Sequence, residues 1–184
     1  MKLTDSEKLI LIMLCDIHEA LKLKNSVDPK FIREAIYSDN TWGLDWKYSG
    51  IFGSSETPQV VVNEVVDILD MWSFLEHGYD KLSQADKDQV EADAIPFGKT
   101  VRFLGFDGNN ETEHMSVARF LIEQLGRFDS FKNRGDLNAH MPSLNTYQRM
   151  LSVFKPLRTG LADRSLSANE IIEILKARLH PSNR

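Results

Sequence analysis

A long apolar run, from Gln59 to Tyr79, constrains the fold of this chain more than any other segment. The run is rich in valine, a residue that favours strands locally. Its polar residues nevertheless recur at helical intervals, whereas a half-buried strand would alternate polar and apolar residues. The residues that set this spacing are Asn63, Glu64, Asp67 and Asp70. The pattern therefore predicts one long helix.

Two capping boxes mark the starts of further helices. Thr4 stands three residues before Glu7, and Ser167 stands three residues before Glu170. In this arrangement the hydroxyl accepts from the amide three residues on, while the glutamate side chain accepts from the amide of the capping residue. Apolar residues at helical intervals follow both boxes. Each box therefore predicts where a helix begins.

Most other segments of the chain also follow the helical period, and we find no internal repeat. We therefore predict an all-α, multihelical protein with a single domain over residues 1–184. Pro96 and Gly98 interrupt residues 94–100, which is where two helical subdomains would be joined. The short apolar segment Val101–Phe106 fits either a strand or an extended connector.

Composition excludes several classes of protein. The chain has 184 residues, with 27 acidic and 22 basic side chains and a formal charge of −5. That balance argues against a generally basic surface for nucleic acid. No stretch approaches the ~20 apolar residues of a membrane span. Cys15 is the single cysteine, so no internal disulfide can form. We expect a soluble, cytoplasmic protein in a reducing compartment.

Two sequence patterns resemble chemical motifs but are incomplete. Gly98-Lys99-Thr100 resembles the end of a phosphate-binding loop, yet Asp93 stands where that loop needs a glycine. Glu111 and His114 form a Glu-x-x-His pattern, but a di-iron bundle needs a second copy and two further carboxylates. We therefore predict no metal and no cofactor.

Several motifs together resemble the YfbU family. Val101–Asp107 reads V-x-F-L-G-F-D, the core of that family, and the similarity covers nearly the whole chain in consistent order. The other matching segments are Arg119-Phe120, Gly126–Phe128, Phe131, Tyr147–Leu151 and Leu166–Ile171. The resemblance implies a bacterial, predominantly helical protein with oligomeric tendency. It implies no catalytic residues, because the family has no agreed biochemical activity.

Our leading hypothesis is a non-enzymatic, oligomeric interaction or regulatory protein. Several predicted helices carry more apolar surface than one core-facing stripe requires. The helix after Thr4 shows this best, because its apolar positions from Leu9 to Leu21 occupy more than one side. We predict a homo-oligomer, with a further protein partner of unknown identity.

Two other hypotheses remain open. An enzyme or a binder of small anions would use the polar members of the family motifs, with Asp107 as a base, arginines holding the anion and Tyr147 orienting it. That set is Asp107, Arg119, Arg127, Tyr147 and Arg149. Alternatively, the predicted helices at 4–24 and 28–37 could form a helix-turn-helix that binds nucleic acid, which the acidic charge disfavours.

Overall fold

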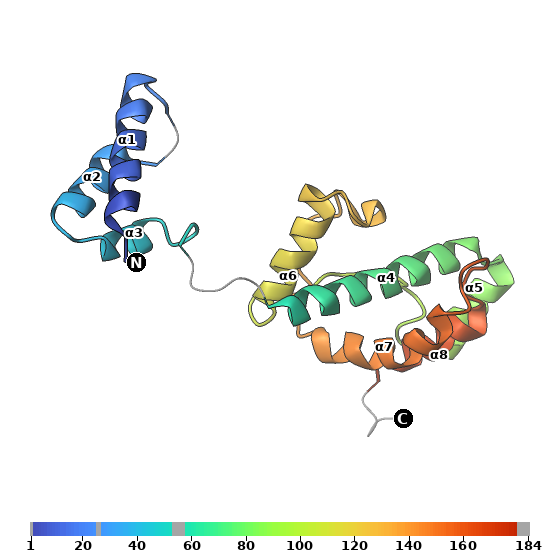
Figure 1. The fold of residues 1–184 in the computed structure, drawn as a ribbon. Helices are drawn as coiled ribbons and strands as arrows, with labels where there is room; N and C mark the ends of the chain where they lie inside the picture. Colours follow the sequence, from blue (N-terminus) through green and yellow to red (C-terminus); the bar gives the residue numbers. More distant parts are fainter. Residues whose placement is uncertain (1, 25–26, 53–57, 180–184) are drawn as a thin grey trace. The chain divides into compact units, whose positions relative to one another are not determined.

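A computed structural model describes residues 2–24, 27–52 and 58–179, and every element within these ranges is helical, turn or extended connector. The chain divides into two compact units, residues 1–56 and residues 57–184. The all-α prediction is confirmed for the described residues, which form eight α-helices and no strand (Figure 1). None of these helices is long and apolar enough to cross a membrane.

The first unit contains three helices: α1 (Asp5–Ala20), α2 (Pro29–Tyr37) and α3 (Trp42–Lys47). The predicted capping box at α1 is confirmed, since Glu7 N donates to Thr4 Oγ1 at 3.3 Å and Thr4 N donates to Glu7 Oε2 at 2.7 Å. Asp28 caps α2 by accepting from two backbone amides at its start.

A small core joins the three helices of the first unit. Its buried members come from α1, α2 and α3, and are Cys15, Ile32, Ala35, Ile36 and Leu44. The Arg33 guanidinium on α2 adds two ion pairs to α1, to Asp16 at 2.5 Å and to Glu19 at 2.6 Å. Only one side of α1 takes part in this core, because its other apolar residues are exposed.

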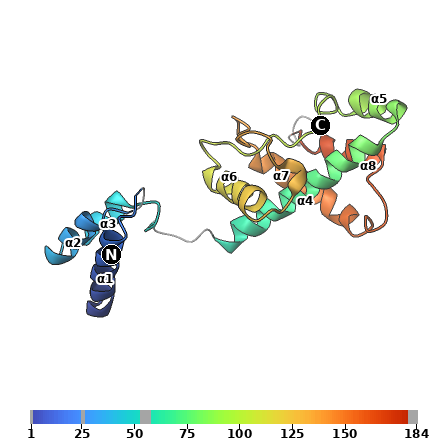
Figure 2. The ribbon, with the colours of Figure 1, turned by 90° about the horizontal axis from the view of Figure 1, so that it is seen from above.

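The second unit is organised around α4 (Gln59–Lys81), which confirms the long helix predicted from its polar spacing. Figures 1 and 2 show α4 as the long axis of this unit, and α6, α7 and α8 all contact it. The remaining elements are α5 (Gln84–Asp93), α6 (Thr112–Arg119), the π-helical segment η1 (Phe120–Gln124), the 3₁₀ turn η2 (Asp129–Phe131), α7 (Leu144–Arg158) and α8 (Ala168–Lys176).

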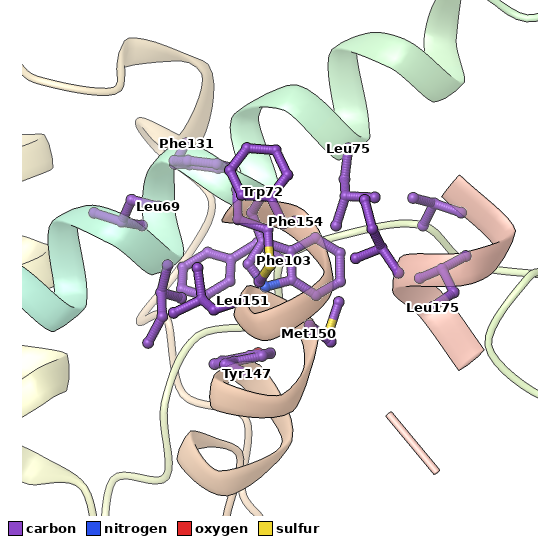
Figure 3. Close-up of a cluster of buried hydrophobic side chains, with 14 of the residues drawn as sticks. Leu69, Trp72, Leu75, Phe103, Phe131, Tyr147, Met150, Leu151, Phe154 and Leu175 are labelled. Carbon is purple, nitrogen blue, oxygen red and sulfur yellow. The ribbon is translucent and has the colours of Figure 1, made fainter. Parts of the chain in front are cut away.

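The core of the second unit lies between α4, α7 and α8 (Figure 3). Large side chains along α4 are fully buried there, with Trp72 only 1% exposed. The buried residues labelled in Figure 3 are Leu69, Trp72, Leu75, Phe103, Phe131, Tyr147, Met150, Leu151, Phe154 and Leu175. Burial of this apolar surface is the main favourable contribution to folding of the unit.

Residues 101–106 form an extended connector, which settles the alternative left open above. Phe106 makes one isolated parallel bridge with Asn138. Gly105 reaches this position with φ +97°, and a Cβ there would lie 1.8 Å from the Leu137 carbonyl oxygen. Only glycine tolerates both the backbone angle and the approach.

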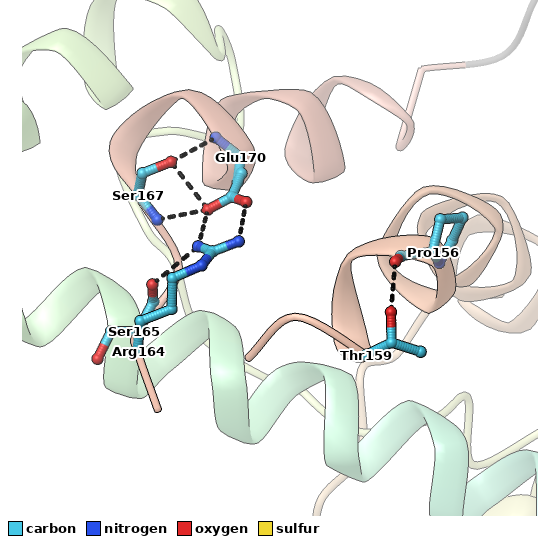
Figure 4. A network of polar contacts seen from close by, with 6 residues as sticks. All are labelled: Pro156, Thr159, Arg164, Ser165, Ser167 and Glu170. Carbon is cyan, nitrogen blue, oxygen red and sulfur yellow. Dashed lines mark hydrogen bonds and ion pairs between the residues drawn. The ribbon is translucent and has the colours of Figure 1, made fainter. Parts of the chain in front are cut away.

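Two positions in the second unit where the sequence indicates a break are residues 94–100 and Pro156, a proline that is expected to end the helix before it. Residues 94–100 form turns after α5 and lie inside this unit, whereas the two compact units meet between residues 56 and 57. The expectation for Pro156 is wrong, because Pro156 lies within α7 and the helix continues to Arg158. Thr159 Oγ1 then donates to the Pro156 carbonyl at 3.2 Å (Figure 4).

The second predicted capping box begins α8 and is reinforced by an arginine (Figure 4). Ser167 N donates to Glu170 Oε2 at 2.8 Å, completing the box. Arg164 binds both oxygens of Glu170, each at 2.7 Å. The hydrogen bond from Arg164, aided by those from Ser167, outweighs burial and lowers the pKa of Glu170 from 4.5 to about 2.

We predict that Gly105→Ala destabilises the protein far more than Gly135→Ala. Gly135 has a similar φ of +91°, but no atom lies near the position of an added Cβ. The difference therefore isolates the clash with the Leu137 carbonyl, and overpacking of this kind costs about 1–3 kcal/mol. Urea unfolding of both variants measures it. Equal losses of stability would contradict the account of Gly105.

Glu170 predicts a specific dependence of stability on pH. Because its folded pKa lies below 4.5, its contribution is present above pH 4.5 and is lost as pH falls toward about 2. Glu170→Gln should therefore flatten the acid limb of stability between these values. Glu173→Gln, at an exposed position of α8, is the control. Chemical unfolding at stepped pH gives the comparison, and an unchanged limb in Glu170→Gln would refute the assignment.

Candidate functional site

Buried polar side chains of the described residues gather where the connector 101–111 meets the start of α7. They are Asp107, Glu111 and Ser143. A buried polar group is costly unless it is hydrogen-bonded, so this cluster is the first place to look for a functional site. The signature segment Val101–Asp107, which carries the family resemblance, leads directly into it.

The Glu111 carboxylate is the centre of this cluster. Its Oε1 accepts from Ser143 N and Leu144 N, each at 2.7 Å. Its Oε2 accepts from Asp107 N at 2.9 Å and from Ser143 Oγ at 2.7 Å. The first amides of a helix have no partner within the helix, so Glu111 caps α7 from outside it. Sequence analysis missed this role because residues 111 and 143 lie 32 positions apart.

The environment of Glu111 keeps it ionised. Burial raises the pKa of its carboxyl, but the hydrogen bonds from the Asp107, Leu144 and Ser143 amides and the Ser143 hydroxyl outweigh burial. The net effect lowers the pKa below its ordinary value. A carboxylate whose acceptor positions face fixed donors is suited to holding the backbone, and poorly suited to accepting a proton from a substrate.

Tyr147, one of the five predicted site residues, is buried beside Glu111's cluster. Its hydroxyl donates to the Gly105 carbonyl at 2.9 Å, and burial raises the pKa of the phenol. The ring packs edge-on against Trp72 and Phe106, with centroids 5.8 Å away in both cases. Phe103, also from the signature segment, joins the same aromatic group. Tyr147 therefore links α7 to the connector.

Asp107 is also held within the chain. It accepts from Asn109 N at 3.0 Å and from Asn110 Nδ2 at 2.5 Å, closing the turn before α6. The bond from the Asn109 amide, followed by that from Asn110, lowers the pKa of Asp107. A lowered pKa weakens a carboxylate as a general base, which runs against the role of base considered for it.

The three predicted arginines lie at different places. Arg119, at the end of α6, donates through Nε and Nη2 to the Asp136 carbonyl, at 2.8 Å for Nε. Arg149, on α7, donates to the carbonyls of Ala177 at 3.2 Å and Arg178 at 2.8 Å, just after α8. Arg127 is exposed beyond η1.

The described contacts bring no two of these five predicted residues into a hydrogen bond or ion pair with each other. An open groove of about 660 Å³ is bordered by Arg119 and by none of the other four. The two buried members bond other parts of the chain instead. Asp107 accepts from Asn109 and Asn110, and Tyr147 donates to the Gly105 carbonyl. As a binding set for an anion, the five residues stay a prediction.

The Glu-x-x-His pattern separates in space. Glu111 faces the start of α7, whereas His114 Nε2 lies 2.9 Å from Glu64 Oε2 on α4. Gln148 of α7 donates to the other oxygen of Glu64, so α4, α6 and α7 meet at this carboxylate. Within the described part of the chain, no group of three His, Cys, Asp or Glu residues could hold a metal ion.

The first unit offers the broadest exposed apolar surface. Five large side chains of α1, each 52–63% exposed, are Leu9, Ile10, Met13, Leu14 and Ile17. A separate groove of about 590 Å³ lies between α2 and α3, lined in part by Trp42 and Trp46. The broad apolar pattern of the first helix predicts excess apolar surface there. Only the structure shows which of these side chains are exposed.

These features define an all-helical protein in which buried polar residues hold the backbone and α1 carries an exposed apolar face. The YfbU domain model matches residues 1–177. The chain is also 30% identical to the UPF0304 protein MJECS11 of Methanocaldococcus jannaschii over 141 residues, which is 73% of this chain and 79% of that protein. The chain belongs to the YfbU family, as its motifs indicated.

We predict that Glu111→Gln destabilises the protein by about 2–4 kcal/mol, above the typical ~1–3 kcal/mol for one unsatisfied buried group. Both carboxylate oxygens accept from backbone amides, so either orientation of the glutamine amide places one N–H group against another. Glu123→Gln is the control, because exposed Glu123 accepts from one amide among the described residues, that of Asn133. Chemical unfolding measures both. A loss in Glu111→Gln no larger than the control's would contradict the capping role.

Proposed function

We propose that this member of the YfbU family is a non-enzymatic, homo-oligomeric interaction or regulatory protein, acting in the cytoplasm. The observation that carries the proposal is the apolar face of α1. The buried polar residues support it indirectly, because Glu111, Tyr147 and Asp107 bond other parts of the chain and so hold the fold.

The α1 face is continuous. We define it as Leu9, Ile10, Met13, Leu14 and Ile17. At about 100° per residue these five positions fall within an arc of roughly 140°. The opposite side of α1, with buried Cys15, packs on α2. The helix thus has apolar surface on two sides, and the core of its own unit covers one of them.

An exposed apolar face of this size is typical of a protein–protein interface. Six half-exposed large side chains, counting Leu21 just after the helix, present on the order of 600 Å², the upper end for the largest patch on a monomer. Leaving them in water forgoes the stabilisation that burial provides. A partner that covers the face recovers it.

The chemistry of this face favours a protein partner over nucleic acid. Binding to phosphates requires clustered lysines or arginines, and the strength of such binding rises with the number of phosphates neutralised. The α1 face contains none, and the residues on its two edges include Glu7 and Asp16. These acidic edges therefore disfavour binding of nucleic acid to this face.

We predict that the full-length protein is oligomeric at micromolar concentration and that Ile17→Glu weakens association at least tenfold. Burying an unpaired carboxylate costs well over the ~1.4 kcal/mol that corresponds to tenfold. Sedimentation equilibrium over a wide range of concentrations measures the change.

Tyr37→Glu is the matched control, because Tyr37 is 72% exposed in the same unit but lies on α2. It should leave association unchanged. A wild-type chain that stays monomeric at high concentration would overturn the proposal. Equal weakening of association by both substitutions would show that the interface is not specific to α1.

A further inference from the structure

We propose that the partner of the α1 face is α1 of a second copy of this chain, with the two helices antiparallel and crossing near Met13. This inference rests on the proposed homo-oligomeric function and names the surface and geometry of the contact. In such a twofold contact the same face is used twice, so each copy covers the exposed residues of the other.

The spacing of large and small residues suits this pairing. Centred on Met13, an antiparallel arrangement places Leu9 opposite Ile17 of the other copy. It also places Ser6 opposite Ala20, the two small residues that interrupt the apolar arc. Small residues therefore meet small ones at both ends of the contact, where they allow the backbones to approach. The large residues between them fill the centre, as close packing requires.

A carboxylate and an imidazole on one edge of the face are complementary in the antiparallel arrangement. The imidazole would donate through Nδ1, because His18 Nε2 is buried within its own unit. Glu7 and His18 lie 11 positions apart, so they share an edge of α1 within about 20°. Around Met13 the pairing brings Glu7 of one copy within one residue, about 1.5 Å along the axis, of His18 of the other. Glu7 Oε1 accepts no hydrogen bond from the described residues, because the capping box uses Oε2.

The other edge carries two acidic residues, Asp5 in the first turn of α1 and Asp16. Arg33 of the same chain already binds Asp16 at 2.5 Å. The helix dipoles favour the same arrangement as the side chains, because antiparallel helices place the positive end of one beside the negative end of the other. A parallel pair would instead bring like ends of the dipoles together.

Cysteine cross-linking of the full-length chain tests this geometry. Single cysteines replace Met13, Leu9 or Ile17 in a Cys15→Ala background, and circular dichroism checks folding. If Cys15→Ala does not fold, the same cysteines are placed in the natural chain, where Cys15 is buried. Met13→Cys should form a disulfide-linked dimer at least tenfold faster than Tyr37→Cys, which lies outside the face.

Leu9→Cys and Ile17→Cys decide between the two orientations. In the antiparallel pair two copies of residue 9 are about 12 Å apart along the axis, too far for a disulfide. We expect no fast cross-link for either variant alone and a fast one when the two are mixed. Fast self-linking of Leu9→Cys would establish a parallel contact and overturn the inference.

The cross-linking and sedimentation results distinguish failure of this inference from failure of the proposed function. An oligomer in which no α1 cysteine cross-links overturns the α1 contact while leaving a homo-oligomer in place. A monomer, seen by sedimentation for the same variants before oxidation and for the wild type, overturns the proposed homo-oligomer as well.

Discussion

The second unit of this protein depends on one buried carboxylate. Glu111 satisfies the first amides of α7 and at the same time bonds the Asp107 amide that ends the signature segment. A helix end buried without partners would cost about 1–3 kcal/mol for each unsatisfied group. The position of α7 against α4, and with it the core around Trp72, therefore follows from where Glu111 is held.

That constraint changes how the family motif is interpreted. Gly105 permits the connector to pass the Leu137 carbonyl, and its own carbonyl accepts from Tyr147. Phe103 and Phe106 supply the aromatic core. The signature segment therefore specifies how the second unit is built. Large apolar side chains are instead exposed on α1.

Local features of the fold were predictable from the sequence, and distant ones were not. Both capping boxes act over three residues, and the polar spacing of α4 is a property of one helix, so each could be identified from a short stretch. Pro156 shows the limit of such rules. A proline within a helical pattern is expected to end the helix, yet α7 continues past Pro156 to Arg158. The bond between Glu76 and Arg134 joins residues 58 positions apart, and no local pattern signals it.

The predicted site shows the same limit. The sequence predicts Arg119 and Arg149 as anion ligands because guanidinium groups suit anions, but in the structure they donate to carbonyls of residues that precede or follow other helices. Residue type gives the chemistry that a side chain can perform, whereas only the fold shows which partner it has taken. The excess apolar surface of the first helix was visible as a pattern. Which of its sides remained exposed became clear only once α2 was placed.

The signature segment holds the fold, and we propose that α1 makes the contact between copies. Hydrogen exchange of the full-length protein, followed by mass spectrometry across a dilution series, tests both halves together. We predict that exchange in α1 slows as concentration rises through the dissociation constant, while exchange in residues 101–111 stays unchanged. Slowing confined to residues 101–111, with α1 unaffected at every concentration, would contradict the claim.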